Sequence, residues 1–277
     1  MSSPASDADS IDFDTLVTPA PLSPGRWSIE VPDGWQQGRG AFGGLVLAML
    51  ERAAEAAAGD PARQLRELSA QIVGAVQPGM AEISAELLRA GTGVSAVAAR
   101  LVQEGEVRAH AVATFGKPRA TYAAATSTPA PVLPPWRELS PMPSSLPMVP
   151  TFTRHLEFWP TGPLPFSGSG SGAVPEVAGW VRLRHPGRAR DAAFTLAMVD
   201  AYWPAFLTAA PAPRPAATLT FSLETMSDLA GLDPSAPLFH RGRLLGGRDG
   251  YAVEARELWG EDGRLVALNQ QVFVVIR

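Results

Sequence analysis

The sequence lacks cysteine altogether and has only four histidines. Without thiols the chain has no disulfides, no cysteine nucleophile, no iron–sulfur ligation and no cysteine-based zinc site. The histidines lie far apart and form no HxH or HExxH pattern, so we expect no metal site and no cofactor; they are His110, His155, His185 and His240. Chemistry in this chain must therefore rely on carboxylate, amide and hydroxyl side chains.

The sequence also lacks an excess of positive charge and long apolar runs. It has 23 basic and 27 acidic residues, so no overall positive field attracts nucleic acid or an anionic membrane. No stretch approaches the ~20 apolar residues of a membrane-spanning helix. The polar, acidic start is unlike a secretory signal. We expect a soluble, cytoplasmic protein whose 277 residues fill one large domain or two small ones.

Two changes in composition divide the chain. Residues 1–12 are polar and acidic, which is typical of a disordered tail. Nine of the 33 residues in 118–150 are proline, and proline interrupts both helices and sheets, so this segment is interpreted as a linker or a surface crossing. The expected domains are residues 13–117 and 151–277.

Both domains show the same order of elements. A helical pattern over 42–58 and another over 191–207, the second stopped near Pro204, are apolar on nearly every side. A helix of that kind must be buried on every side. A short strand is expected at 179–185, before the second helix. Four runs that alternate with period 2 follow each helix, at 65–76, 80–91, 94–105 and 106–116, and at 217–226, 237–247, 251–260 and 263–276.

Short matches between the two halves support an internal duplication. LAMLE at 47–51 and LAMVD at 196–200 occupy corresponding places in the helices, and GEVRAHAVATF at 105–115 aligns without a gap on GRLVALNQQVF at 263–273. The predicted fold is α+β, with two tandem repeats that each wrap an antiparallel sheet around a long buried helix.

Asp200 and Gln271 are polar where the pattern is apolar. Asp200 ends an apolar helix, and a carboxylate there must be paired, protonated or functional. Gln271 lies in an alternating strand where the first repeat has Ala113, and a buried amide needs partners. Two alternatives stay open: Glu51 matches Asp200, so both acids could mark exposed helix ends, and Gln270 rather than Gln271 could face inward.

Three further features are weaker signals. Thr218 starts the strand after the Asp200 helix, where threonine is ordinary. Gly43 and Gly44 open the first helix next to Phe42, and glycine there lets a ligand approach the free N–H groups at the positive end of the helix dipole. Tight helix packing explains the glycines equally well. A GxSxG elbow is missing, which disfavours a serine hydrolase.

Several motifs, in this order, resemble the acyl-CoA thioesterases with a double hotdog fold, in particular the type II enzymes and their actinobacterial relatives. The resemblance runs from about Trp35 to the C-terminus, interrupted by the Pro-rich segment. The motifs are RGAFGG at 39–44, GWVRLR from 179, MVDAYWP at 198–204, PAATLTF at 215–221 and EDGRLVALNQQ at 261–271.

The resemblance implies a catalytic Asp, Thr and Gln, which map onto Asp200, Thr218 and Gln271. It also implies hydrolysis of an acyl-CoA or acyl-carrier thioester by a positioned water, with Phe42, Gly43 and Gly44 near the substrate. The chain departs from the family at Leu45, where relatives often have glutamine. Sheets of this kind usually pair across subunits, so a homodimer or larger assembly is expected.

Two other functions remain open from the sequence. The chain could bind acyl-CoA or another lipid without catalysis, which the loss of glutamine at Leu45 favours slightly. It could also be a hydratase or dehydratase on the same fold. Such relatives usually place a histidine next to the catalytic acid, and the Asp200 motif contains none.

Overall fold

A computed structural model of the chain describes residues 11–120, 128–143, 149–168, 174–187, 191–228, 233 and 235–276. The expected tail lies outside these residues except for its last two positions, and so do parts of the Pro-rich segment. Asp12, at the end of the expected tail, caps the first helix, because its carboxylate accepts a hydrogen bond from the Thr15 N–H at 2.9 Å.

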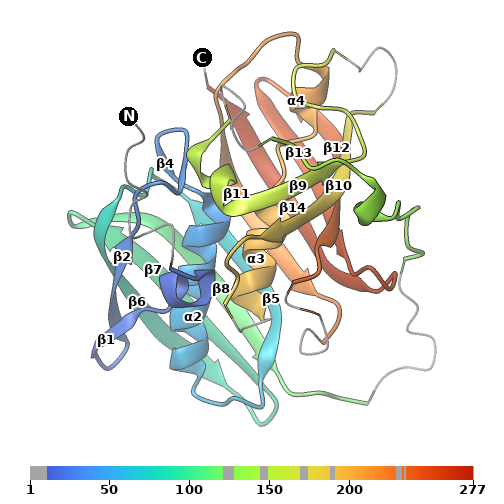
Figure 1. The fold of residues 1–277 in the computed structure, drawn as a ribbon. Coiled ribbons are helices and arrows are strands. Elements are labelled where there is room, and N and C mark those ends of the chain that lie inside the picture. The colour runs from blue at the N-terminus through green and yellow to red at the C-terminus, as the bar shows by residue number, and fades with distance from the viewer. Residues whose placement is uncertain are drawn as a thin grey trace.

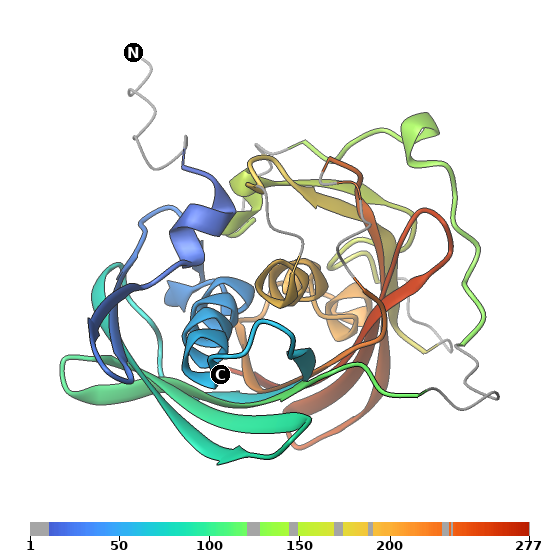
Figure 2. The same ribbon diagram turned by 90° about the horizontal axis from the view of Figure 1, so that it is seen from below.

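Within the described residues, twelve strands form one antiparallel sheet that curves around two helices (Figure 1 and Figure 2). The strand order is β1-β2-β6-β7-β8-β5-β11-β14-β13-β12-β10-β9, and β3 pairs with β4 separately. The first half contains β1 (Ala20–Ser23), β2 (Arg26–Val31), β3 (Gln36–Gln37), β4 (Gly40–Ala41), β5 (Gln64–Ile72), β6 (Gly79–Ala90), β7 (Val94–Gln103) and β8 (Glu106–Gly116). The second half contains β9 (Leu156–Pro160), β10 (Glu176–Leu183), β11 (Ala216–Thr225), β12 (Leu238–Arg248), β13 (Tyr251–Trp259) and β14 (Leu265–Val275).

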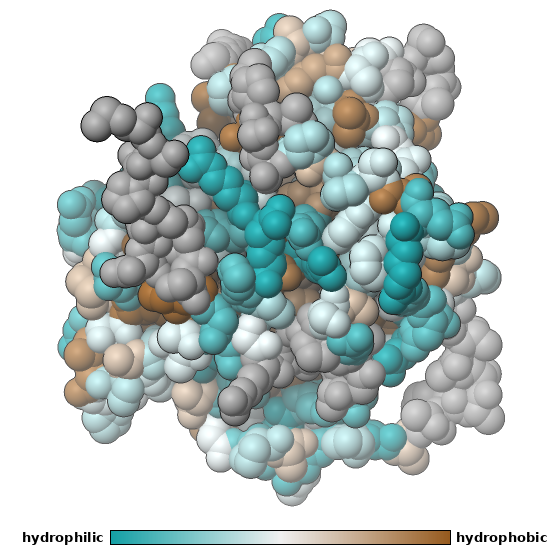
Figure 3. Space-filling model, in the orientation of Figure 1, coloured by the Kyte–Doolittle hydropathy of each residue, from teal (hydrophilic) through white to brown (hydrophobic). Residues whose placement is uncertain are grey.

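The described helices are few and mostly short. They are α1 (Phe13–Val17), α2 (Gly43–Ala58), α3 (Ala192–Asp200) and α4 (Phe206–Ala209), with 3-10 turns at Trp136–Glu138 and Thr151–His155. None of these helices is long and apolar enough to cross a membrane. Hydrophilic side chains gather across the middle of the face shown in Figure 3, in front of the two central helices of Figure 1.

The first core helix forms where the apolar pattern predicts it, but the second predicted helix, 191–207, ends at Asp200, and the short helix α4 follows after Pro204. Helix α2 begins at Gly43 and ends at Ala58, and Gly59, with a φ of 67°, is the left-handed cap that glycine adopts without strain. Helix α3 is capped by Asp191, whose carboxylate accepts from the Phe194 N–H, and all nine of its residues are buried. The prediction of burial on every side is thus confirmed for α3, whereas α2 is exposed in its last turns, at Glu55 and Ala56.

The two halves repeat one register and join through one strand pair. In the first half Leu65 lies opposite Phe115, with an irregularity just after Leu65; in the second half Thr218 lies opposite Phe273, with the same irregularity just after it. Strands β5 and β11 pair directly from Thr220↔Gln71 to Glu224↔Glu67, which makes the sheet continuous. The eight strands expected after the helices are all present, so the predicted duplication is confirmed at the level of structure.

The described part of the Pro-rich segment crosses the outer face of the second half. Its side chains Leu133, Trp136 and Leu139 pack against an aromatic cluster on that face, made of Trp159, Trp180, Phe239, Trp259 and Leu265. The indole N–H of Trp180 donates to the Pro134 carbonyl at 2.8 Å. This described part of the segment therefore shields apolar area from water.

Candidate active site

The core helices bring Asp200 to the start of α2. Helices α2 and α3 pack side by side, with Asp200, the last residue of α3, against Gly43 (Figure 2). A Cβ at Gly43 would lie 2.7 Å from Asp200 Oδ2, so glycine is needed for this approach. Asp200 is only 6% exposed, and Glu51 is 1% exposed. The alternative that both acids mark exposed helix ends is therefore wrong.

Gln271 faces inward from β14 and binds the Asp200 carboxylate. Its Nε2 group donates to Asp200 Oδ1 at 2.9 Å and to Asn269 Oδ1 at 3.2 Å. Gln271 has no exposed surface, whereas the neighbouring Gln270 is exposed. The structure thus decides between the two glutamines in favour of Gln271, and every polar atom of its amide has a partner.

Thr218 completes a chain of three side chains. Its Oγ1 donates to Gln271 Oε1 at 3.1 Å, so the order is Thr218, Gln271, Asp200. Because a glutamine amide accepts through Oε1 and donates through Nε2, Gln271 can bridge the Thr218 hydroxyl and the Asp200 carboxylate. The half-buried hydroxyl of Thr218 lies at the start of β11.

The first turn of α2 contacts this chain directly. The Gly44 N–H hydrogen-bonds to the Asp200 carboxylate. The ring of Phe42 is fully buried, stacks on Phe152 with centroids 4.2 Å apart, and covers the place of a Gly44 side chain. Of the N–H groups that the glycines were expected to open to a ligand, the one of Gly44 is thus bound to the carboxylate. Leu45 is buried in the core.

Burial raises the pKa of Asp200 above its usual value. The charge of Arg256 and the hydrogen bonds from Gln271 and Gly44 favour the ionised form and oppose this shift, while the charge of Glu254 adds to it. A carboxylate with a raised pKa and four polar neighbours is a suitable proton acceptor near neutral pH.

Three further polar residues, which the sequence pattern does not single out, lie next to Asp200 or Gln271. Asn269 is buried and accepts from Gln271. Arg256 and Glu254 are also buried, on β13, and Arg256 Nη1 lies 3.6 Å from Asp200 Oδ1. The alternating pattern of β14 could have indicated Asn269, since it lies two residues before Gln271 and therefore on the same inward face.

The corresponding place in the first half lacks this chain of side chains. By register, Glu51 matches Asp200, Leu65 matches Thr218, and Ala113 matches Gln271. Neither Leu65 nor Ala113 can hydrogen-bond to a carboxylate through its side chain. The constellation therefore occurs once in the described chain.

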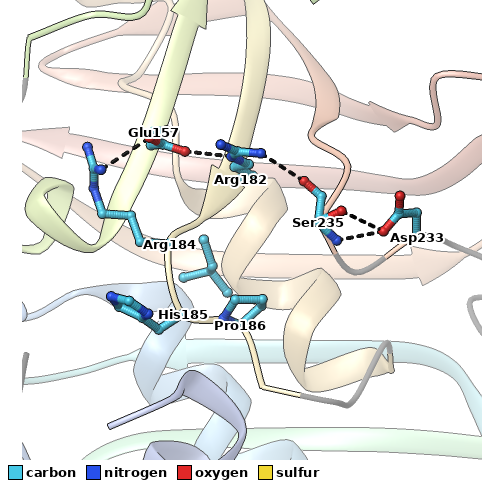
Figure 4. A pocket seen from close by; sticks show the side chains of 8 residues that line it. Glu157, Arg182, Arg184, His185, Pro186, Asp233 and Ser235 are labelled. Atoms are coloured by element: carbon cyan, nitrogen blue, oxygen red, sulfur yellow. Dashed lines mark hydrogen bonds and ion pairs between the residues drawn. The ribbon is translucent and has the colours of Figure 1, made fainter. Parts of the chain in front are cut away.

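A separate pocket of about 520 Å³ opens beside β9 and β10 (Figure 4). Arg182 and Arg184 line it, and both bind the carboxylate of Glu157; Arg182 also donates to the Ser235 carbonyl at 3.1 Å. The lining is charged and its arginines are already paired, so it suits an acyl chain poorly. Among the described residues, no group of three His, Asp or Glu side chains could hold a metal ion.

Comparisons with known proteins agree with this fold. Residues 31–116 match the model of the acyl-CoA thioesterase N-terminal domain, and residues 125–275 match that of the C-terminal domain. No curated protein matches the sequence.

Solved structures show the same fold at low sequence identity. A hot dog protein of unknown function from Alicyclobacillus acidocaldarius is 22% identical, with a TM-score of 0.83 over 96% of this chain and 98% of that one. A protein named as a putative thioesterase II, from Thermobifida fusca, is 24% identical, with a TM-score of 0.81 over 96% of this chain and 97% of that one. An acyl-CoA thioesterase II from Mycobacterium marinum is 18% identical, with a TM-score of 0.74 over 95% of this chain and 98% of that one.

The two matched domains together span most of the sequence, in the order in which the double hotdog repeats occur. This agreement confirms the prediction of an acyl-CoA thioester hydrolase. The chain belongs to the acyl-CoA thioesterase family and is an acyl-CoA thioester hydrolase.

Proposed function

We propose that the chain hydrolyses a fatty-acyl or related CoA thioester with a water held by Asp200, Thr218 and Gln271. The observation that supports this assignment is the hydrogen-bonded chain of these three side chains at the start of α2. Asp200 is the general base, and Gln271 and Thr218 orient it and the water.

In the proposed reaction the water oxygen attacks the thioester carbonyl carbon while one of its protons passes to Asp200. The carbonyl oxygen becomes a tetrahedral oxyanion, which the Gly43 N–H at the positive end of α2 stabilises. The C–S bond then breaks, the leaving thiolate takes up the proton that Asp200 accepted, and the free acid and CoA leave with Asp200 again ionised. The Gly44 N–H keeps the carboxylate in place during this sequence.

Phe42 belongs to the proposed substrate site as an apolar wall. Its ring lies beside Gly44 and against Phe152, next to the base. An acyl chain in contact with these rings would exclude bulk water from the carboxylate, which strengthens the electrostatic terms there.

The test of this function is the Asp200→Asn variant. We expect its kcat for thiol release from acyl-CoA to fall by about 100- to 10,000-fold, because the amide does not accept a proton from water. A panel of acyl-chain lengths would be used, with Asp249→Asn, at an exposed turn, as the control. Near-normal hydrolysis by folded Asp200→Asn would disprove the assignment of Asp200 as the general base.

The finer expectations from the sequence are part of the proposal. The domains are residues 13–117 and 151–277, flanked by a tail at 1–12 and separated by a linker at 118–150. The active form is a homodimer or larger homo-oligomer in the cytoplasm. The sheet edges at β1 and β9, whose outer backbone groups face no further strand of the described sheet, support association between chains.

A further inference from the structure

Arg256 is a buried cation at the end of the helix that carries Asp200. It is 1% exposed, and its Nη1 lies 3.2 Å from the Val199 carbonyl oxygen and 3.5 Å from that of Asp200. The same nitrogen lies 3.6 Å from Asp200 Oδ1. Arg256 therefore contacts both the last carbonyl groups of α3 and the carboxylate, but it does not reach solvent.

The position of Asp200 makes such a cation necessary. A carboxylate at the C-terminal end of a helix faces the negative end of the helix dipole. Burial adds a desolvation cost for the charged form. Both effects favour the protonated acid, which cannot accept a proton from water. A buried guanidinium opposes both effects at once.

Glu254 holds Arg256 and limits its contact with Asp200. Arg256 Nε donates to Glu254 Oε1 at 2.9 Å, and Glu254 Oε2 accepts from the Ala205 N–H at 2.6 Å. Glu254 is fully buried and thus fixed between the arginine and the loop after α3. Because the guanidinium is shared, it approaches Asp200 through one nitrogen instead of forming a two-pronged pair.

We propose that Arg256, oriented by Glu254, is a positioning residue that keeps Asp200 ionised and aimed at the reacting water. This inference rests on the proposed role of Asp200. Arg256 supplies the positive charge, and Glu254 sets how much of that charge acts on Asp200. Neither residue touches the substrate.

The other groups around Asp200 are neutral. Gln271 faces it from β14 and the Gly44 N–H from α2. His240 on β12 is fully buried and stacks on Tyr202, and burial together with Arg256 holds the pKa of the imidazole well below its usual value. Burial raises the pKa of the Tyr202 hydroxyl, which also stays uncharged. Among the described residues, Arg256 and Glu254 are therefore the charges that act on Asp200.

The test is the pH dependence of kcat/KM for thiol release in Arg256→Met and Glu254→Gln. Activity needs ionised Asp200, so the acid limb follows its pKa in the free enzyme. Arg256→Met removes an opposite charge, and we expect the limb to move to higher pH by about 1 to 3 units. Glu254→Gln removes a like charge, and we expect the limb to move to lower pH.

Two controls separate positioning from general structure. Arg241→Met breaks another ion pair of the same sheet, with Glu257 at 2.8 Å, and the limb should not move. Arg256→Lys keeps the charge and should restore the limb toward the wild-type position. A purely structural role would instead lower kcat/KM by the same factor at every pH.

The outcomes are distinguishable. If Arg256→Met does not fold, Glu254→Gln, which keeps the side-chain shape, decides the question alone. An unmoved acid limb in Glu254→Gln, or in folded Arg256→Met, overturns the inference while Asp200→Asn remains inactive. Activity in Asp200→Asn would instead overturn the proposed function itself.

Discussion

Glu51 and Asp200 occupy matching positions in the two core helices, but the carboxylate of Glu51 lacks the hydrogen-bonded chain of side chains that binds Asp200. Oε2 of Glu51 is buried without a hydrogen-bond partner among the described residues. Burial raises the pKa of Glu51 well above its usual value; Glu55 and Asp191 raise it further, and Arg52 opposes them. At the residue scale, Glu51 is a buried acid with one carboxylate oxygen that has no hydrogen-bond partner among the described residues.

This difference predicts that Glu51→Met stabilises the protein at pH 8. Because the pKa of Glu51 is raised in the folded state, its contribution to stability is full below its ordinary value near 4.5 and is lost as pH rises through the folded pKa. We expect the free energy of unfolding to rise by about 1 to 3 kcal/mol at pH 8 and to change less at pH 5.

Urea denaturation of both proteins at the two pH values measures this. Exposed Glu106→Met serves as the control and should change stability little at either pH. Equal effects of Glu51→Met at pH 5 and pH 8 would contradict the assignment of a raised pKa.

The residues of the site differ in how far the sequence predicts them. Asp200 and Gln271 stand out because each interrupts an apolar pattern. Thr218 does not, since threonine is common in strands; only the family resemblance indicates it. Glu254 and Arg256 share one face of β13 and alternate with Val253 and Ala255, so the period-2 pattern predicts that they face solvent, whereas the structure buries them.

At the scale of elements, the site depends on how closely α2 and α3 approach. A Cβ at Gly44 would lie 2.8 Å from the Ala197 Cα and 2.6 Å from the Phe42 ring. Backbone atoms of α3 cannot move away as a flexible side chain can. The sequence left ligand approach and helix packing as equal explanations for Gly44, and the structure supports packing.

Gly44→Ala therefore tests the helix contact. We expect a loss of about 1 to 3 kcal/mol in the free energy of unfolding, because the extra methyl group overpacks the contact. Thiol release should fall as well, since the Gly44 N–H would shift relative to Asp200. Denaturant unfolding and activity are measured together. The control is Gly93→Ala, because a Cβ at Gly93 would meet nothing within 4 Å. Equal stability of the two variants would show that a methyl group at Gly44 does not overpack the helix contact.

At the scale of the whole molecule, the double repeat was predictable from the sequence, but its asymmetry was predictable only in part. The order of helix and strands, and the match of the last strands, were enough to predict two related halves. The pairing of β5 with β11 was not predictable, because strand partners far apart in the chain depend on tertiary packing. That pairing places the two helices against each other and brings Asp200 to Gly43.

Two similar halves with one constellation predict one substrate site for each chain. We expect a non-hydrolysable acyl-CoA analogue to bind with a stoichiometry of one, because Leu65 and Ala113 replace the polar partners in the first half. Isothermal titration calorimetry measures this number. Two equivalent sites for each chain would show that the first half also binds substrate.

The Pro-rich crossing has a consequence for symmetry. Its residues Leu133, Trp136 and Leu139 cover the aromatic cluster on the outer face of the second half. That part of the face is occupied by the chain itself and is closed to a neighbouring copy. The two repeats thus differ on the outside of the sheet as well as in the core. Their outer faces therefore present different surfaces to a neighbouring chain.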